Sequence, residues 1–364
     1  MNSAEKSAVY IHWPFCKSKC PYCDFYKEIN PHINQDEIID EYIAALRRYH
    51  EITAEREITS IFFGGGTPSL IHPANIARII DYISQSWHTA QNLEISLEAN
   101  PNTYEKNLFA DFKTAGINRL SLGVQALNTD DLHLLGRTHS LTEARQCLEK
   151  IVTVFDNCSA DLIYARPQQK IDGWVRELEE ICRYGLTHIS AYELTIEEGT
   201  VFARRNVIPA DEETALKMTA ATVEILEQNG YHRYEISNYA RRGCRCRHNL
   251  VYWQGDDYIG IGKSAHGRLR LNGKHIATVY PFMHEELSAA ERAEELIIMG
   301  LRLTDGINKH HFTEVCGLDF HDCVNPQALQ QLIAENMLAE SKDYVYATAD
   351  GLYLLNEIVR QLCG

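Results

Sequence analysis

The sequence predicts an α/β fold in which parallel strands are joined by helices, and three observations lead to this prediction. Short apolar runs alternate six times with longer segments of helical periodicity. Helix-stop signals, "AGI" at 115–117 and "YGL" at 184–186, come directly before the next expected strand. Polar residues gather at the expected carboxyl ends of the strands, where parallel sheets bind their ligands.

The six β/α units follow one another over roughly the first two thirds of the chain. Right-handed crossovers between parallel strands fit either an open doubly wound sheet or a full or partial β/α barrel, and periodicity does not choose between the two. The expected strands are Ala8–Phe15, Ser60–Gly65, Leu93–Ala99, Arg119–Gln125, Ala160–Ala165 and His188–Thr195. The expected helices are Asp36–Ile52, Pro73–Trp87, Tyr104–Ala115, Leu141–Val152, Ile171–Arg183 and Asp211–Asn229.

The pattern changes after about residue 285 and predicts a smaller second domain. Helices followed by a hairpin resemble a winged-helix module, and the low positive charge favours a packing or lid role over DNA binding. We expect a β/α domain over 1–240, a connecting segment over 241–285 and a winged-helix-like domain over 286–364. The expected elements of the last domain are helices Ser288–Leu301, Lys309–Cys316 and Pro326–Glu335, strands Tyr344–Thr348 and Gly351–Leu355, and a final helix.

Composition narrows the class of protein. The formal net charge of −15 argues against a nucleic-acid partner, which needs a concentrated basic face. The first residues, "MNSAEKSAVYIHWPF", lack the apolar core of a signal peptide, and no stretch approaches the ~18 uninterrupted apolar residues of a membrane span. Eleven cysteines, three of them in one tight cluster, indicate a reducing compartment and a metal rather than disulfides. We therefore expect a cytoplasmic protein with no membrane span.

The segment "WPFCKSKCPYCDFY" holds that cluster, with Cys16, Cys20 and Cys23 in a C-x3-C-x2-C spacing. A structural zinc site needs a fourth ligand, for which the candidates are His12, expected within the first strand, and the sequence-distant Cys244 and Cys246. An iron–sulfur cluster fits better, because thiolates suit iron and usually hold a [4Fe–4S] cube in fours. With three thiolates, one iron keeps an open position that can chelate an amine and a carboxylate.

This loop, placed directly after a first strand, resembles the radical S-adenosylmethionine (SAM) superfamily. The resemblance implies that the open iron holds the amino and carboxylate groups of SAM and that reduction releases a 5′-deoxyadenosyl radical. We then interpret the triple glycine in "FFGGGTP" at 62–68 as the site for the SAM amino group, because a backbone without side chains can approach a ligand closely.

The match extends over nearly the whole chain. "YIHWPFCKSKCPYCDF", "FFGGGTPS", "SLEANP", "RLSLGVQ", "LGRTHS", "DLIYARP", "YEISNYA" and "HNLVYW" together resemble the oxygen-independent coproporphyrinogen III oxidase family, and within it most closely the HemW branch of heme chaperones. The family implies a six-unit partial β/α barrel with a helical C-terminal domain. It also implies that Cys16, Cys20 and Cys23 ligate the cluster. The residues implied to line SAM are Tyr10, Gly65, Gly66, Thr67, Glu98, Gln125, Arg137 and Asp161.

Two features favour the chaperone branch over the oxidases. The oxidases carry an additional cysteine two residues after the third, where this chain has Phe25, and an N-terminal extension where this sequence has only seven residues before the first strand. "HNLVYW" matches the H-N-x-x-Y-W motif linked with heme in the chaperone branch. His248 offers an imidazole to heme iron, and Tyr252 and Trp253 offer flat apolar surface. Cys246 and His266 are alternative iron ligands, and a hydrogen-bonded turn packed on a core is the alternative structural interpretation.

The resemblance thus implies a heme chaperone that binds a [4Fe–4S] cluster, SAM and heme. Its partners would be heme-acceptor respiratory enzymes, including acceptors at the membrane, and an electron donor. A coproporphyrinogen III dehydrogenase or another radical-SAM enzyme acting on a tetrapyrrole is the alternative, and no catalytic residue is assigned. The chain departs from the family pattern in two loops. "DLIYARPQQ" replaces "DLIYGLPGQ", so that Ala165, Arg166 and Gln168 differ, and "GIGKSAHG" places Lys263 and Ser264 in a glycine-rich turn.

Overall fold

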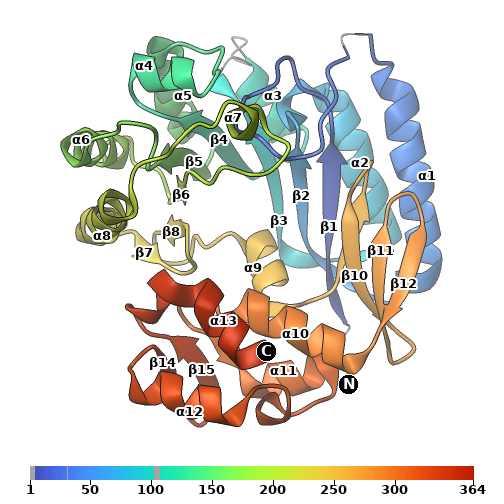
Figure 1. The fold of residues 1–364 in the computed structure, drawn as a ribbon. Helices are drawn as coiled ribbons and strands as arrows, with labels where there is room; N and C mark the ends of the chain where they lie inside the picture. Colours follow the sequence, from blue (N-terminus) through green and yellow to red (C-terminus); the bar gives the residue numbers. More distant parts are fainter. Residues whose placement is uncertain (1–4, 31, 102–106) are drawn as a thin grey trace.

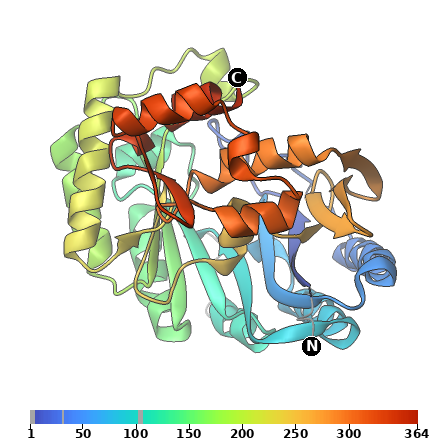
Figure 2. The same ribbon diagram turned by 90° about the horizontal axis from the view of Figure 1, so that it is seen from below.

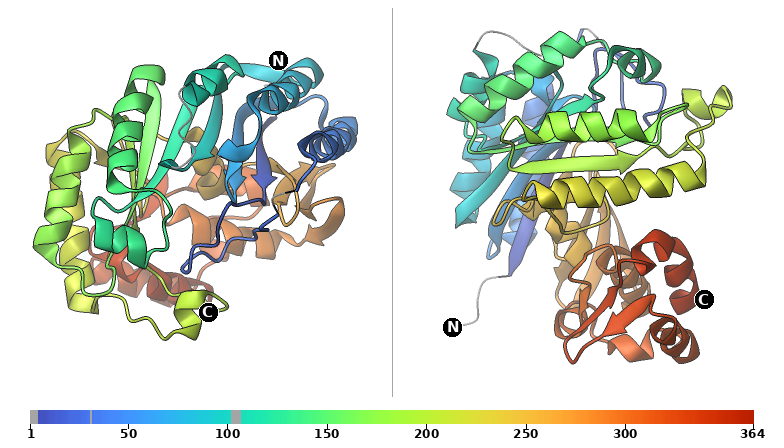
Figure 3. Two further views of the ribbon diagram at one scale, coloured as in Figure 1. Left: turned by 90° about the horizontal axis from the view of Figure 1, so that it is seen from above. Right: turned by 90° about the vertical axis from the view of Figure 1, so that its left-hand side faces the viewer.

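The computed structural model describes residues 5–30, 32–101 and 107–364 (Figure 1). Six parallel strands stand side by side in chain order, from β1 to β6, and curve around an open centre (Figure 3). β1 pairs with β2 and β9, not with β6, so the ring stays open. This arrangement confirms the partial barrel. The strands are β1 Lys6–Trp13, β2 Glu57–Gly65, β3 His88–Ala99, β4 Arg119–Gln125, β5 Asn157–Tyr164 and β6 His188–Glu193.

Helices cover the outer face of these strands (Figure 3). The helix expected to begin at Tyr104 starts, within the described residues, at Leu108, and residues 102–106 lie outside the description. The long outer helices are α1 Gln35–Thr53, α2 Pro73–Ser86, α3 Leu108–Thr114, α5 Leu141–Val154, α6 Ile171–Cys182 and α8 Glu212–Gln228. Three short elements near the rim were not expected, namely η1 Pro68–Leu70, α4 Thr129–Leu134 and α7 Val201–Arg204.

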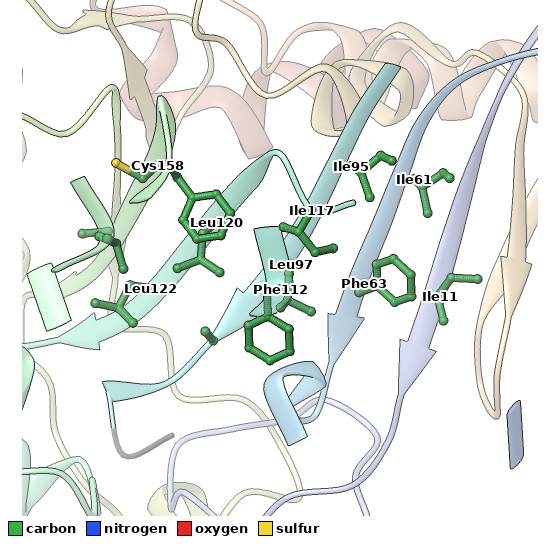
Figure 4. Close-up of a cluster of buried hydrophobic side chains, with 14 of the residues drawn as sticks. Ile11, Ile61, Phe63, Ile95, Leu97, Phe112, Ile117, Leu120, Leu122 and Cys158 are labelled. Atoms are coloured by element: carbon green, nitrogen blue, oxygen red, sulfur yellow. The ribbon is translucent and has the colours of Figure 1, made fainter. Parts of the chain in front are cut away.

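Alternate residues of each strand point to opposite sides of the barrel wall. One set forms the main core against the helices, where Ile11, Phe63, Leu97 and Leu120 are fully buried (Figure 4). The other set points into the barrel and is largely polar. Ser121, for example, donates a hydrogen bond to Asp161 on the next strand. This division leaves the interior free to carry chemistry while the outer layer supplies the stability.

Further strands extend both edges of the sheet: the segment expected as a connection adds strands next to β1, and the end of the expected β/α domain adds two next to β6. β9 lies parallel to β1, and a meander of β10, β11 and β12 continues the sheet beyond it. β8 and β7 add antiparallel strands beyond β6. The bounds are β7 His232–Arg233, β8 Asn238–Ala240, α9 Arg247–Gln254, β9 Tyr258–Ile261, β10 His266–Leu271, β11 Lys274–Val279 and β12 Met283–Leu287.

The C-terminal part has its own hydrophobic core beneath the barrel (Figures 1 and 2). The expected strand Gly351–Leu355 is wrong, because Gly351–Leu354 forms a 3-10 helix (η4), at whose start Gly351 N donates a 3.0 Å hydrogen bond to Thr348 Oγ1. The real hairpin partner of β15 is β14. The elements are α10 Ala289–Gly300, β13 Ile307–Asn308, α11 Lys309–Cys316, η3 Phe320–Asp322, α12 Pro326–Ala334, β14 Leu338–Glu340, β15 Tyr344–Ala347 and α13 Leu355–Cys363. None of the helices in the described ranges is long and apolar enough to cross a membrane.

Candidate functional site

A cavity of about 420 Å³ opens at the carboxyl ends of the barrel strands. It brings together residues that lie more than 100 positions apart, because parallel strands end at one rim. All three clustered cysteines line it. Seven of the eight residues expected to line SAM also line it, namely Gly65, Gly66, Thr67, Glu98, Gln125, Arg137 and Asp161.

The three cysteines lie in a loop over residues 14–28, hereafter the cluster loop, at the end of the barrel opposite the C-terminal domain (Figure 1). Two backbone hydrogen bonds join the ends of the loop: Glu28 N donates to Pro14 O at 2.7 Å, and Cys16 N donates to Glu28 O at 3.0 Å. These bonds hold the loop over the ends of β1 and β2 and so restrict the directions in which the thiols point.

Glycine in the loop after β2 is required by packing against this cluster loop. A Cβ on Gly66 would lie 2.8 Å from the carbonyl carbon and oxygen of Pro14. Gly65 has a φ of +110°, and a Cβ there would lie 2.6 Å from the His12 ring. The triple glycine therefore lets β2 close on the cluster loop, in addition to exposing backbone to the cavity.

The donor set fits a cluster held at three corners. The three thiols are not in disulfides, and within the described residues no group of three or more His, Cys, Asp or Glu side chains converges on a single ion. Each thiolate of a cube takes a different iron, so the three need not converge. Two polar contacts reach the sulfurs, from Thr67 Oγ1 to Cys16 Sγ and from an Arg137 Nη to Cys20 Sγ, each at 3.5 Å. Such hydrogen bonds stabilise thiolate charge.

Arg137 occupies the centre of the cavity wall. Its guanidinium donates to Gly123 O at 3.0 Å and also binds Asn100 and Tyr22, two cavity residues that the sequence did not single out. Its Nε is buried without a partner among the described residues. The strong cation and the free donor fit a carboxylate ligand.

Two buried carboxyls face the same space. Burial, together with the charge of Asp161, raises the pKa of Glu98 to about 8. Glu98 accepts a 3.2 Å hydrogen bond from Gly65 N, and Asp161 accepts from Ser121 Oγ at 3.1 Å. Burial raises the pKa of Asp161 as well. A carboxyl that holds its proton near neutral pH can donate to, as well as accept from, the hydroxyls of a ligand.

Tyr10 does not line the cavity with the other expected residues. Its hydroxyl lies 2.9 Å from His12 Nδ1, and its ring lies 6.2 Å from the His248 ring. Tyr10 thus forms a layer beneath the cavity, between the rim and the barrel interior. Direct contact of Tyr10 with SAM stays a prediction.

The H-N-x-x-Y-W motif forms helix α9, at the opposite end of the barrel from the cluster loop (Figure 1). His248 is fully buried and stacks on Phe62 with ring centroids 5.0 Å apart. Its Nδ1 lies 2.9 Å from Ser60 Oγ and its Nε2 lies 2.7 Å from the Tyr252 hydroxyl. Burial lowers the pKa of His248 to about 3, so the imidazole is neutral. Both ring nitrogens are engaged within the barrel.

Trp253 faces the C-terminal domain instead. It lines a cavity of about 260 Å³ together with Leu296 and Leu303, and the Arg302 guanidinium carbon lies 4.6 Å from the centroid of its ring. The structure therefore brings His248 and Tyr252 together but places Trp253 on another surface. The alternative ligand Cys246 is buried, whereas His266 is exposed.

Comparison with known proteins shows the family of the chain. The family model of the radical SAM superfamily matches residues 10–192, and that of the HemN C-terminal domain matches residues 287–354. The chain is 32% identical to the heme chaperone HemW of Escherichia coli over 97% of each chain. The chain belongs to the HemW family of radical SAM proteins.

Other HemW relatives are similarly close. The chain is 40% identical to heme chaperone HemW of Buchnera aphidicola from Schizaphis graminum, over 75% of this chain and 73% of that one. It is 35% identical to the mitochondrial radical S-adenosyl methionine domain-containing protein 1 of zebrafish, over 85% and 76%. The solved coproporphyrinogen III oxidase HemN of E. coli shares the fold, with a TM-score of 0.81 at 19% identity over 98% of this chain and 90% of that chain.

The departures from the HemW family pattern place non-glycine residues in left-handed backbone conformations and an arginine in the core. Three positions where that pattern has glycine are in the left-handed region, Ala165 at φ 57°, Gln168 at 61° and Ser264 at 65°. Arg166, in place of leucine, is fully buried and paired with Glu177. The backbone thus keeps the turns that glycine would favour, at non-glycine residues.

Proposed function

We propose that this protein is a heme chaperone that binds a [4Fe–4S] cluster, SAM and heme and transfers heme to acceptor respiratory proteins. The observation that carries the proposal is the near full-length similarity to proteins named heme chaperone HemW, in a chain whose rim cavity gathers three cysteines and seven expected SAM residues. The fold class and the family are established above, and the cofactors and the transfer step are the proposed part.

The cavity residues divide into two groups by chemistry. Cys16, Cys20 and Cys23 would ligate the cluster, which when bound supplies an open iron and an electron for cleaving SAM. Arg137 would orient the SAM carboxylate, and Glu98 and Asp161 would bind its hydroxyls. The barrel wall would exclude water from the reacting end.

Heme would be bound through the motif on α9, with His248 as the proposed iron ligand. A neutral imidazole is the form that binds iron, and burial keeps His248 neutral. The geometry adds a condition, because His248 is fully buried and one of its ring nitrogens must leave Ser60 or Tyr252 before it can reach a porphyrin iron. Binding of heme at His248 therefore requires α9 to move away from the barrel interior.

The second candidate is a coproporphyrinogen III dehydrogenase, which the shared fold with HemN favours. Phe25 lies at the cavity mouth where the oxidases have a further cysteine, and this difference favours the chaperone.

One anaerobic experiment separates the two functions. The full chain is reconstituted with iron and sulfide and supplied with SAM and a low-potential reductant, and heme binding and coproporphyrinogen III turnover are measured in parallel. We expect stoichiometric heme binding by absorbance titration and no decarboxylated product by mass spectrometry. His248→Ala should weaken heme binding, whereas His310→Ala, at a solvent-exposed histidine, should not. Product formation without heme binding would establish the oxidase instead. Unchanged heme binding by His248→Ala would exclude that residue as the ligand.

A further inference from the structure

The barrel interior holds a buried carboxylate that lies outside the cavity at the rim. Glu94 belongs to β3, four residues before Glu98, and alternate residues of a strand face the same side of the sheet. Glu94 therefore faces the barrel interior, as Glu98 does, but at the end of the barrel nearer to α9 (Figure 1). The residue is only 6% exposed. A carboxylate in such a place needs hydrogen-bond donors, and α9 provides them.

The carboxylate of Glu94 caps the first turn of α9 from outside the helix. Its Oε2 accepts a hydrogen bond from Arg247 N at 3.2 Å, and its Oε1 accepts one from His248 N at 3.1 Å. The thiol of Cys246 also donates to Oε1, with a sulfur–oxygen distance of 3.6 Å. The first N–H groups of a helix have no carbonyl acceptor within the helix, and the helix dipole favours a negative charge at this end. Glu94 thus stabilises the contact of this turn with β3.

The opposite end of α9 is held by different parts of the molecule. His311 Nε2, on α11, lies 3.1 Å from Gln254 O at the end of the helix. The chain then enters β9, which pairs with β1. The first turn of α9, in contrast, follows a loop in which Arg242 and Gly243 are exposed. The first turn is therefore the end of α9 that can leave the barrel without breaking the sheet.

Release of the first turn would be enough to free the proposed heme ligand. His248 is the second residue of α9, so its imidazole would move away from Ser60 with that turn. The same movement would leave the Glu94 carboxylate in a buried site without the N–H groups that now donate to it. A buried charged acceptor that loses its donors costs more than an exposed one, because water replaces the donors poorly. The contacts of Glu94 therefore oppose the exposure of His248.

We propose that Glu94 is a positioning residue that holds the first turn of α9 on the barrel and thereby limits the access of heme to His248. This inference rests on the proposed function, because it concerns heme binding through His248. In the step, two backbone N–H groups exchange the carboxylate for water, and the imidazole exchanges its contact with Ser60 for coordination of the heme iron. No electron is transferred and no covalent bond of the chain breaks.

Glu94→Gln tests this role. Glutamine keeps the shape of the side chain and one acceptor oxygen, but it removes the negative charge and the second acceptor. Ferric heme is added to the full chain, and the association rate is followed by stopped-flow absorbance. We expect association about tenfold faster than in wild type and a dissociation constant about tenfold lower, since apparent affinity rises with the population of the state that binds. Replacement of a residue with a merely structural role would weaken heme binding instead.

A second variant acts from the helix side and leaves the buried carboxylate in place. Arg247 is exposed and occupies the first position of α9, where proline is tolerated, and Cys246 already has the extended backbone that precedes a proline. Arg247→Pro removes the N–H that donates to Glu94 Oε2. It should bind heme faster than Arg247→Ala, which loses the same side chain but keeps this N–H.

Hydrogen exchange of the heme-free protein, followed by mass spectrometry, measures the opening of α9 without any ligand. Peptides that cover α9 should exchange faster in Glu94→Gln than in wild type. Glu177→Gln is the matched control, because Glu177 is also buried and accepts from a backbone N–H, that of Leu127 at 2.7 Å, but lies on α6. It should leave both α9 exchange and heme association unchanged. Glu94→Gln/His248→Ala should lose the gain in association rate, because that gain acts through His248.

The outcomes distinguish the failures. Unchanged α9 exchange and unchanged heme association in Glu94→Gln would overturn the role of Glu94 and leave the proposed function intact. Faster exchange without faster heme association would overturn it too, because release of the first turn would then not limit access. Acceleration in Glu177→Gln as well would assign the effect to a general loss of stability. A wild-type protein that binds no heme would refute the proposed function, and the role of Glu94 in heme access with it.

Discussion

Replacing Arg166 tests how much a buried charge, at a position where the family pattern has leucine, contributes to the stability of this chain. The side chain is fully buried between β5 and α6, and its guanidinium contacts Glu177, with one Nη–Oε distance of 3.3 Å, and Asp131 at 3.2 Å. Replacement by leucine, the residue in the family pattern, removes the cation and leaves the Glu177 carboxylate buried. Breaking a buried ion pair from one side costs about 3–5 kcal/mol. Because Glu177 still accepts from Leu127 N at 2.7 Å, we expect the lower end, about 3 kcal/mol.

Guanidinium chloride unfolding followed by far-ultraviolet circular dichroism measures this cost. Arg166→Leu combined with Glu177→Gln should recover most of the lost stability, because no uncompensated charge then stays at the Glu177 position. A double-mutant cycle on Arg166 and Glu177 should therefore give a coupling energy of about 2 kcal/mol. If the unfolding free energy of Arg166→Leu lies within about 1 kcal/mol of the wild-type value, the buried ion pair contributes little to stability and the reasoning is refuted.

Three further predictions concern the rim and its turns. Gly66→Ala should lower cluster occupancy, measured as iron per chain, because the new Cβ meets the Pro14 carbonyl at 2.8 Å. Ser264→Gly should raise the unfolding free energy by about 0.5–1 kcal/mol, since this exposed residue has a φ of 65°. Without SAM, stability should fall as the pH rises from about 5 to 8, because Glu98 has a pKa near 8 when folded and a lower one when unfolded, and Glu98→Gln should reduce this fall.

Each of these has a matched comparison. Gly173→Ala adds a Cβ to helix α6 whose nearest neighbour is an Arg176 nitrogen at 4.0 Å, so iron content should not change. Ser264→Ala keeps the strained backbone and should gain nothing. A steeper loss of stability with pH in Glu98→Gln than in wild type would contradict the assignment of the proton to Glu98.

Local patterns predicted the six parallel strands and the position of the cysteine loop because both depend on neighbours in sequence, whereas the choice of a partial barrel came from the family resemblance. The alternation of buried and inward-facing residues in β1 to β6 follows from the period of two, and the cluster loop is a single short segment. Parallel strands end at one rim, so residues at their carboxyl ends met as expected in the cavity. Tyr10 is the exception, because its side chain packs next to His12 and the buried His248 beneath the cavity.

Contacts between segments that lie far apart in the sequence could not be predicted from local patterns. β9 has only four residues, and it reaches the barrel strands through its pairing with β1, 250 residues earlier. β14 spans three residues, too few to show a period, which explains why the partner of β15 was misplaced. Asn100 and Tyr22 join the site through contacts with Arg137, a residue distant from both in the sequence, and no local pattern marks them.

The H-N-x-x-Y-W motif shows what helical spacing adds to a motif. Positions i and i+4 share a helix face, so His248 and Tyr252 meet, and the 2.7 Å contact between them follows from the spacing. Position i+5 lies about 100° further around the helix, so Trp253 turns toward the C-terminal domain. A flat porphyrin cannot touch all three side chains while α9 stays helical and seated on the barrel. Heme binding through the whole motif therefore requires unwinding or displacement of α9, and α9 links the chemistry of the motif to the packing of the C-terminal domain.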